Sequence, residues 1–122
     1  GSPFAPVEVG GQLRRIGQCN NCFLFPGLGF ACVAVGASEV SEAMIDAGLE
    51  ALARLIPAWS DPEAPLMPEL TEVAVVSTAV AEAVALAAVE AGVARHASTA
   101  EQALACLERA RWHPTYRAVV GA

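Results

Sequence analysis

The spacing of apolar positions changes near residue 25, from an extended pattern to a helical one. Before that point, two short runs, residues 7–9 and 12–16, flank the pair Gly10 and Gly11. Glycine readily adopts the positive φ angles that tight hairpin turns require, so this part of the chain predicts a small β-hairpin. The apolar runs that follow predict four helices.

The first of these runs, residues 28–36, follows Pro26 and Gly27. Proline suits the first turn of a helix and disfavours a helical conformation in the residue before it. We therefore expect Phe25 to be extended and a helix to begin after it. Because the run is almost wholly apolar, we expect this helix to be buried on all sides.

A second helix is predicted between Ser41, a good N-terminal cap, and Pro57, which ends it. Apolar residues recur in it at spacings of four, three and four: Ile45, Leu49, Leu52 and Ile56. Acidic residues and one arginine occupy other faces, so the helix is amphipathic. The proline-rich loop over residues 57–69 is long enough to suggest a role in docking.

The third run, residues 71–91, is long enough to suggest a membrane span. Three carboxylates divide it, however: Glu72, Glu82 and Glu90. Carboxylates within a span cost free energy, so a central core helix that ends near Gly92 is the favoured interpretation. A capping box of Ser98 and Glu101 predicts a last helix that ends near Arg111.

The composition narrows the classes of function. The 122 residues carry a net charge of −6, and all seven basic residues are arginine. The acidic balance argues against nucleic-acid binding. With no lysine, the chain itself supplies no lysine base or Schiff-base amine. The first 15 residues show neither a signal-peptide nor a transit-peptide pattern, so we expect a cytoplasmic protein with reduced thiols.

Two small motifs suggest chemistry that the rest of the chain does not support. Cys19 and Cys22 form a C-x-x-C pair, but neither a helix N-terminus nor two further ligands at zinc spacing accompany them, so two inert thiols are favoured over a redox pair or a metal site. Gly27 and Gly29 resemble part of a dinucleotide-binding turn, but Cys32 stands where a third glycine belongs. Small residues that allow close helix packing explain them better.

The remaining candidate is the run of amide side chains at Gln18, Asn20 and Asn21. Carboxamides donate and accept hydrogen bonds, which suits recognition of carboxylates and hydroxyls better than acid–base chemistry. Asparagine pairs are also common turn formers, and from composition alone that explanation is the more frequent one. Neither aspartate, Asp46 or Asp61, has the acidic neighbours of a divalent-metal site.

Residues 17–27 resemble the Gln-x-Asn-Asn-x-aromatic-x-Phe-Pro-Gly motif of malic enzymes. Residues 1–7 are similar to the Gly-Ser-Pro-Phe-x-Pro-Val segment that precedes this motif in the family. Residues 66–68 and 112–117 resemble later family segments, in order and spacing. The resemblance covers the whole chain, and Tyr116, its sole tyrosine, does not match the catalytic one of the family.

This resemblance implies a fold and a function. Malic enzymes oxidise malate with NAD or NADP and decarboxylate the product to pyruvate, with Mg²⁺ or Mn²⁺. By resemblance, Asn20 lies at the nicotinamide end of the cofactor and Asn21 hydrogen-bonds malate. The catalytic and metal-binding residues of the family belong to segments upstream of Gly1. Residues 1–122 are then an incomplete domain of the α/β class, the C-terminal part of a Rossmann-type NAD(P)-binding domain, mainly helical with one β-hairpin.

We expect such a segment to be inactive alone, with no catalytic residue and no metal ligand of its own. Much of the parallel sheet is missing, so the apolar faces of the helices over 28–36 and 71–91 should lack cover, which favours a homo-oligomer. Neither a nucleic acid nor a membrane is an expected partner. The alternative is a free-standing helical interaction module without catalysis.

Overall fold

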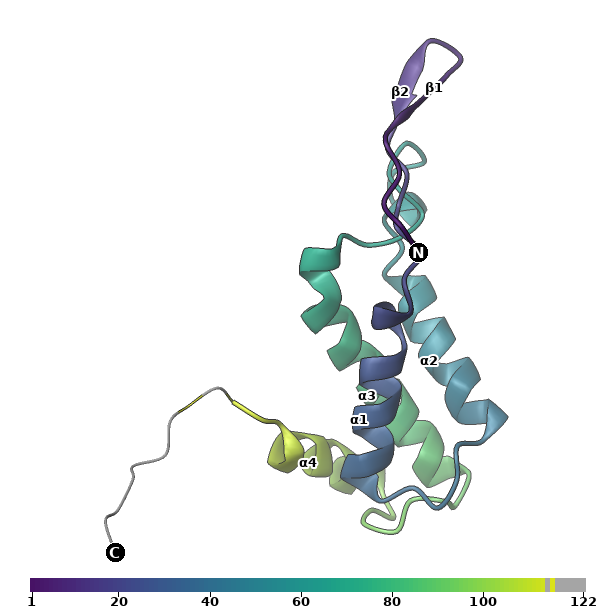
Figure 1. Cartoon of the computed structure of the whole chain (residues 1–122). Coiled ribbons are helices and arrows are strands. Elements are labelled where there is room, and N and C mark those ends of the chain that lie inside the picture. Colours follow the sequence, from purple (N-terminus) through teal and green to yellow (C-terminus); the bar gives the residue numbers. More distant parts are fainter. Residues whose placement is uncertain (114, 116–122) are drawn as a thin grey trace, which may run out of the picture.

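A computed structural model describes residues 1–113 and 115, and these are mostly helical (Figure 1). Their elements are β1 (Val7–Val9), β2 (Gln12–Arg14), α1 (Phe25–Val35), α2 (Glu42–Arg54), α3 (Val73–Glu90) and α4 (Ala100–Ala110). Single 3₁₀ turns are η1 (Asn21–Phe23), η2 (Pro57–Trp59) and η3 (Leu70–Glu72). The predicted order of a hairpin and four helices is confirmed for the described residues.

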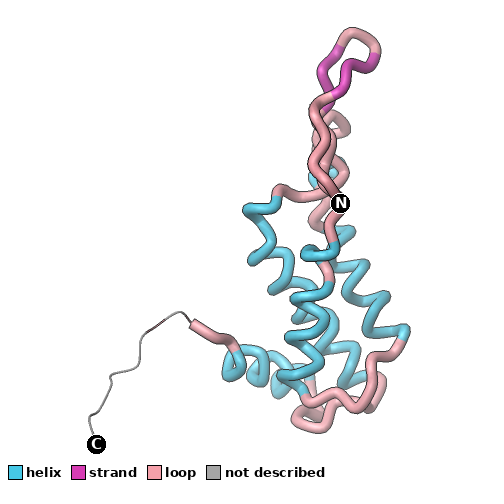
Figure 2. Tube along the Cα trace, in the orientation of Figure 1, coloured by secondary structure: helices cyan, strands magenta, loops and turns pink. Residues whose placement is uncertain are grey.

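The hairpin forms where the glycine pair predicts it. Strands β1 and β2 pair antiparallel, with Glu8 opposite Leu13. Gly10 and Gly11 have φ angles of 60° and 77°, which a side chain would strain. The hairpin extends away from one end of the helices (Figure 1), and loops connect it to them (Figure 2).

Helix α3 is the centre of the structure, and helices α1, α2 and α4 all pack on it. Its buried residues are Val76, Val80, Ala81, Val84, Ala85, Ala87 and Ala88. With η3 it forms a helical stretch, Leu70–Glu90, that is long and apolar enough to cross a membrane by length and composition alone. In the described structure three helices cover it, as the interpretation as a core helix predicts.

Two expectations for α1 are wrong. The helix begins at Phe25 rather than after Pro26, because turn η1 leads directly into it and the proline occupies the first helical turn, where it needs no N–H partner. The helix is also not buried on all sides. Val33 is 78% exposed, and Phe25 and Gly29 lie on the same exposed face. An apolar face of α1 therefore lacks cover among the described residues, whereas the middle of α3 is covered, which differs from the prediction for residues 71–91.

Helix α2 forms with Ser41 as its cap, whose hydroxyl accepts from the Met44 N–H. Its core-facing residues are only partly the ones that the periodicity favours, because Leu52 packs against the core but Ile45 and Leu49 do not. Met44 and Gly48 are buried, whereas Ile45 and Leu49 are 36% and 46% exposed. The helix is rotated by about one position relative to the predicted face, because its small residues allow the closest approach to α3.

The cap of α4 also differs by one residue from the prediction. Thr99, not Ser98, is the N-cap, and its hydroxyl accepts from the Gln102 N–H. The Gln102 side chain in turn accepts from the Ser98 backbone N–H at 2.8 Å. Glutamine thus supplies the return bond that the sequence assigned to Glu101. The segment 112–117 is described only at residues 112, 113 and 115, so Tyr116 lies outside the described residues.

The interface between α1 and α3 depends on a glycine, Gly27, which has no side chain to hold the two helices apart. A Cβ added at Gly27 would lie 2.6 Å from the Ser77 carbonyl oxygen and 2.8 Å from the Val80 Cβ. Nothing lies within 4 Å of the same position on Gly29. The explanation by close helix packing is therefore confirmed for Gly27, whereas Gly29 faces open space.

We predict opposite effects for the same substitution at these two glycines. Gly27→Ala forces the α1 and α3 backbones apart and should lower the free energy of unfolding by roughly 1–3 kcal/mol. Gly29→Ala, two residues along the same helix, should raise it by about 0.5–1 kcal/mol, because alanine favours the helix. Urea unfolding of both variants measures the difference. Equal effects would contradict the close packing at Gly27.

Candidate functional site

Turn η1 carries the asparagine pair and is fixed by one of its members. Asn20 is extended, with φ −127° and ψ 138°, and its side-chain oxygen accepts from the Cys22 N–H at 3.1 Å. Two backbone bonds, from Phe23 N–H to the Asn20 carbonyl and from Leu24 N–H to the Asn21 carbonyl, complete the turn. Asn20 therefore forms the turn through its side-chain oxygen, as the interpretation of the pair as turn formers predicts.

The core holds this turn in place from one side. Phe23 is fully buried, and η1 contacts both α1 and α3. Asn21, two residues before it, is exposed. Among the described residues, no hydrogen bond engages the Asn21 side chain. A rigid turn thus presents a carboxamide whose donors and acceptor are all open to a ligand.

The residues just before the asparagine pair contact two other parts of the chain. A Cβ at Gly17 would lie 2.8 Å from the Met67 backbone nitrogen, so the two backbones touch. The Gln18 side-chain amide donates to the Gly1 carbonyl oxygen. Gln18 therefore binds the chain itself in this structure, and the residues left for ligand recognition are Asn20 and Asn21.

Two ion pairs join the hairpin segment to the proline-rich loop. Arg14 lies 3.2 Å from the Glu63 carboxylate, and Arg15 pairs with Glu69. These side chains are largely exposed, so each pair contributes little to stability. The loop over residues 57–69, for which the sequence suggests docking, thus contacts the base of the hairpin of the same chain.

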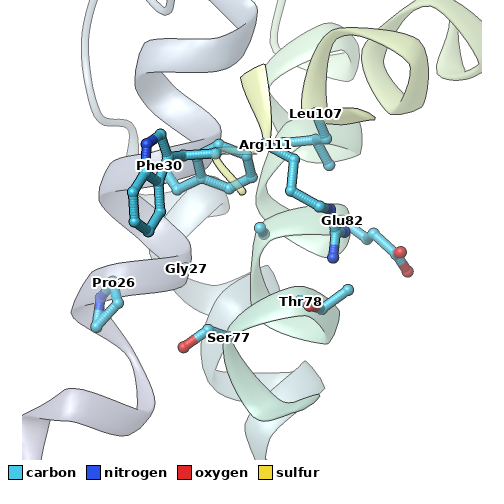
Figure 3. A pocket seen from close by; sticks show the side chains of 10 residues that line it. Pro26, Gly27, Phe30, Ser77, Thr78, Glu82, Leu107 and Arg111 are labelled. Atoms are coloured by element: carbon cyan, nitrogen blue, oxygen red, sulfur yellow. The ribbon is translucent and has the colours of Figure 1, made fainter. Parts of the chain in front are cut away.

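Neither of two nearby cavities contains the asparagine pair. One, of about 220 Å³, lies among the crossing segments and is lined by Phe4, Gln18 and Met67, among others. The other, of about 270 Å³, lies between α1 and α3 at the end of α4 (Figure 3). Figure 3 shows Ser77 and Glu82 on α3 and Arg111 at the end of α4. Asn21 thus lines neither of these two cavities.

Comparison with known proteins identifies the family. The model of the family described as "Malic enzyme, NAD binding domain" matches residues 1–89. The chain is 44% identical over 117 residues to an NAD-dependent malic enzyme of Acinetobacter baylyi, covering 96% of this chain and 20% of that protein. For one of Pseudomonas syringae pv. tomato the identity is 43% over 118 residues, with 97% and 21% covered.

The chain belongs to the malic enzyme family. It spans about a fifth of the length of these relatives. The resemblance seen in residues 17–27 is thereby confirmed, and the chain corresponds to a segment of a malic enzyme. The matched region includes the hairpin, η1, and helices α1 and α2, with nearly all of α3.

Two kinds of site weighed from the sequence, a metal site and a phosphate-binding turn, can be compared with the described residues. These residues contain no group of three or more His, Cys, Asp or Glu side chains that could hold a metal ion. The Gly27 surface that would approach a pyrophosphate is already covered by Ser77 and Val80. The close contacts at Gly27 agree with its interpretation as a packing residue, and Asn21 remains the member of the asparagine pair whose side chain makes no hydrogen bond among the described residues.

The four cysteines are free thiols that differ in exposure. All four are unpaired; Cys19 is exposed, Cys22 and Cys32 are half-buried, and Cys106 is buried. Burial raises the pKa of the Cys32 thiol, although a backbone hydrogen bond opposes the shift. A raised pKa leaves less thiolate near neutral pH, so Cys32 is less nucleophilic than an exposed cysteine.

We predict that a thiol reagent labels the native chain in the order of exposure. Cys19 should react first at pH 8, Cys32 should react slowly and faster as the pH rises, and Cys106 should react only after unfolding. Peptide mass spectrometry of time points measures the order. In the Cys19→Ser variant, the fast phase should be missing. Rapid labelling of Cys106, or tight binding of one Zn²⁺ per chain, would contradict the interpretation as inert thiols.

Proposed function

We propose that this segment forms the malate-binding and nicotinamide-side wall of an enzyme that oxidises malate and decarboxylates the product to pyruvate. The observation that carries the proposal is the exposed carboxamide of Asn21, without a hydrogen-bond partner among the described residues, on a turn fixed by the core. The turn lies inside the region that matches the malic enzyme family. The names of the relatives, NAD-dependent malic enzymes, support the same reaction.

In this reaction, Asn21 orients malate. Its amide nitrogen donates to a malate carboxylate, and its oxygen accepts from the malate hydroxyl. Together these two hydrogen bonds fix the direction in which the C2–H bond of malate points. The amide nitrogen of Asn20 has no partner among the described residues, because only its oxygen is used by the turn. We assign this nitrogen to the nicotinamide end of the cofactor.

The remaining groups come from outside this chain. When bound, the cofactor, NAD as in the relatives' names or NADP instead, would supply the hydride acceptor, and a Mg²⁺ or Mn²⁺ ion would supply positive charge for the decarboxylation. The chain has no lysine to act as a base. We assign no catalytic residue and no metal ligand to it.

We further propose that residues 1–122 are the C-terminal part of a Rossmann-type domain. The uncovered apolar face of α1, with Phe25 and Val33, then lies against the rest of that domain or a second copy in a homo-oligomer. The net charge of −6 disfavours nucleic acid, and the cover of α3 by three helices disfavours a membrane. We place the protein in the cytoplasm.

We predict that the purified 122-residue chain does not reduce NAD or NADP with malate in the presence of Mg²⁺ or Mn²⁺. It lacks a lysine base, and its described residues lack a metal site. The absorbance of the reduced nicotinamide measures the rate of cofactor reduction, with a complete malic enzyme as the positive control. Turnover that persists through further purification would contradict the division of roles proposed above.

We predict that Asn21→Ala, in the complete enzyme that contains this segment, lowers kcat/KM for malate by about ten- to a hundredfold. The substitution removes a hydrogen bond to a charged group, worth roughly 1.5–3 kcal/mol. Because Asn21 is exposed and has no partner among the described residues, the melting temperature should not change. Cys19→Ser, in the same segment, is the matched control and should keep kcat/KM within a few fold. An unchanged kcat/KM in Asn21→Ala would contradict the proposed function.

A further inference from the structure

We infer that Asn20 is a positioning residue for malate: its side-chain oxygen orients Asn21 by capping turn η1, separately from the contact of its amide nitrogen with the cofactor. This inference rests on the proposed function of Asn21. It assigns two separable roles to the two ends of one carboxamide. The resemblance to malic enzymes implies only the cofactor contact.

The hydrogen bonds of the turn support the first role. The Phe23 and Leu24 N–H groups donate to backbone carbonyls within the turn. The Cys22 N–H donates instead to the Asn20 side-chain oxygen at 3.1 Å, and this contact is partly buried. Without that oxygen, the Cys22 N–H loses its acceptor. Asn21 lies between the donor and the acceptor of this bond, so the bond restricts the backbone that carries its carboxamide.

The other restraints on Asn21 act on its backbone, whose carbonyl accepts from the Leu24 N–H at 3.1 Å. The Asn21 side chain is exposed and has no hydrogen-bond partner among residues 1–113 and 115. The buried ring of Phe23 fixes the far end of the turn. The near end, where Asn21 begins the 3₁₀ helix, depends on the extended backbone and the capping oxygen of Asn20. The orientation of Asn21 toward a ligand therefore depends in part on the side chain of Asn20.

Substitutions at Asn20 can separate its capping role from its cofactor contact, because other capping residues keep a side-chain oxygen but lack the amide nitrogen. Serine is as good an N-cap as asparagine, and it keeps a side-chain acceptor while removing the amide nitrogen. Alanine removes both. Aspartate also caps, but its charge would repel the carboxylates of malate, so serine is the cleaner choice.

The experiment measures steady-state kinetics of the complete malic enzyme that contains this segment, with malate and cofactor varied in turn. Asn20→Ala should lower kcat/KM for malate about five- to tenfold and raise KM for the cofactor. Asn20→Ser should restore kcat/KM for malate to within about twofold of the unchanged enzyme, while KM for the cofactor stays raised. A general structural role would move both parameters together in both variants.

A double variant tests whether Asn20 acts on malate through Asn21. If it does, Asn20→Ala should have little further effect on malate once Asn21→Ala is present, so the two effects are not additive. Cys19→Ser is the control for a neutral change beside the pair. Melting temperatures of all variants accompany the kinetics.

Each result decides between the inference and the proposed function. If Asn21→Ala lowers kcat/KM for malate but Asn20→Ala does not, the inference is wrong and the proposed function stands. If Asn20→Ser is as damaging to malate use as Asn20→Ala, or if the double variant shows additive losses, the inference is also wrong. An Asn21→Ala enzyme with normal malate kinetics overturns both. If Asn20→Ala does not fold, the serine variant decides alone, and a loss of malate use in it overturns the inference.

Discussion

The contact between the backbones of α1 and α3 at Gly27 is the constraint on which the site depends. With no side chain between them, α1 lies directly on the Ser77 carbonyl and on Val80. This contact fixes the first turn of α1, and η1 precedes that turn by a single residue, Leu24. The position of the asparagine pair is therefore set by helix packing rather than by the exposed hairpin.

The same use of small residues explains the orientation of α2. A Cβ at Gly48 would lie 3.1 Å from a methyl group of Val84 and 3.2 Å from one of Leu24. Helix α2 thus approaches α3 along its face of small residues, and Leu24 reaches it from beside the site. Close approach at Gly27 and Gly48 brings three helices around Val80, which is fully buried. Burial of α3 results from small residues as much as from large apolar ones.

Sequence patterns predict the elements of this fold better than they predict which face is buried. The hairpin follows from Gly10 and Gly11, and the helix α2 from its cap and its spacing. The buried face of α2 does not follow, because Ile45 and Leu49 are more apolar than Gly48, and hydrophobicity cannot detect the advantage of a close backbone approach. The start of α1 was missed for a related reason: turn η1 continues into the helix, which local preferences around Pro26 do not reveal.

For the proposed site, the sequence motif suggests the residues but not how their atoms are used. The amino-acid sequence of residues 17–27 does not distinguish an asparagine that forms a turn from one that binds a ligand. The hydrogen bond from the Cys22 N–H makes that distinction for each atom, because it uses the oxygen of Asn20 and leaves its nitrogen free of partners among the described residues. A single residue can thus serve both the local structure and a ligand, which explains why the turn-forming and ligand-binding interpretations of Asn20 do not exclude one another.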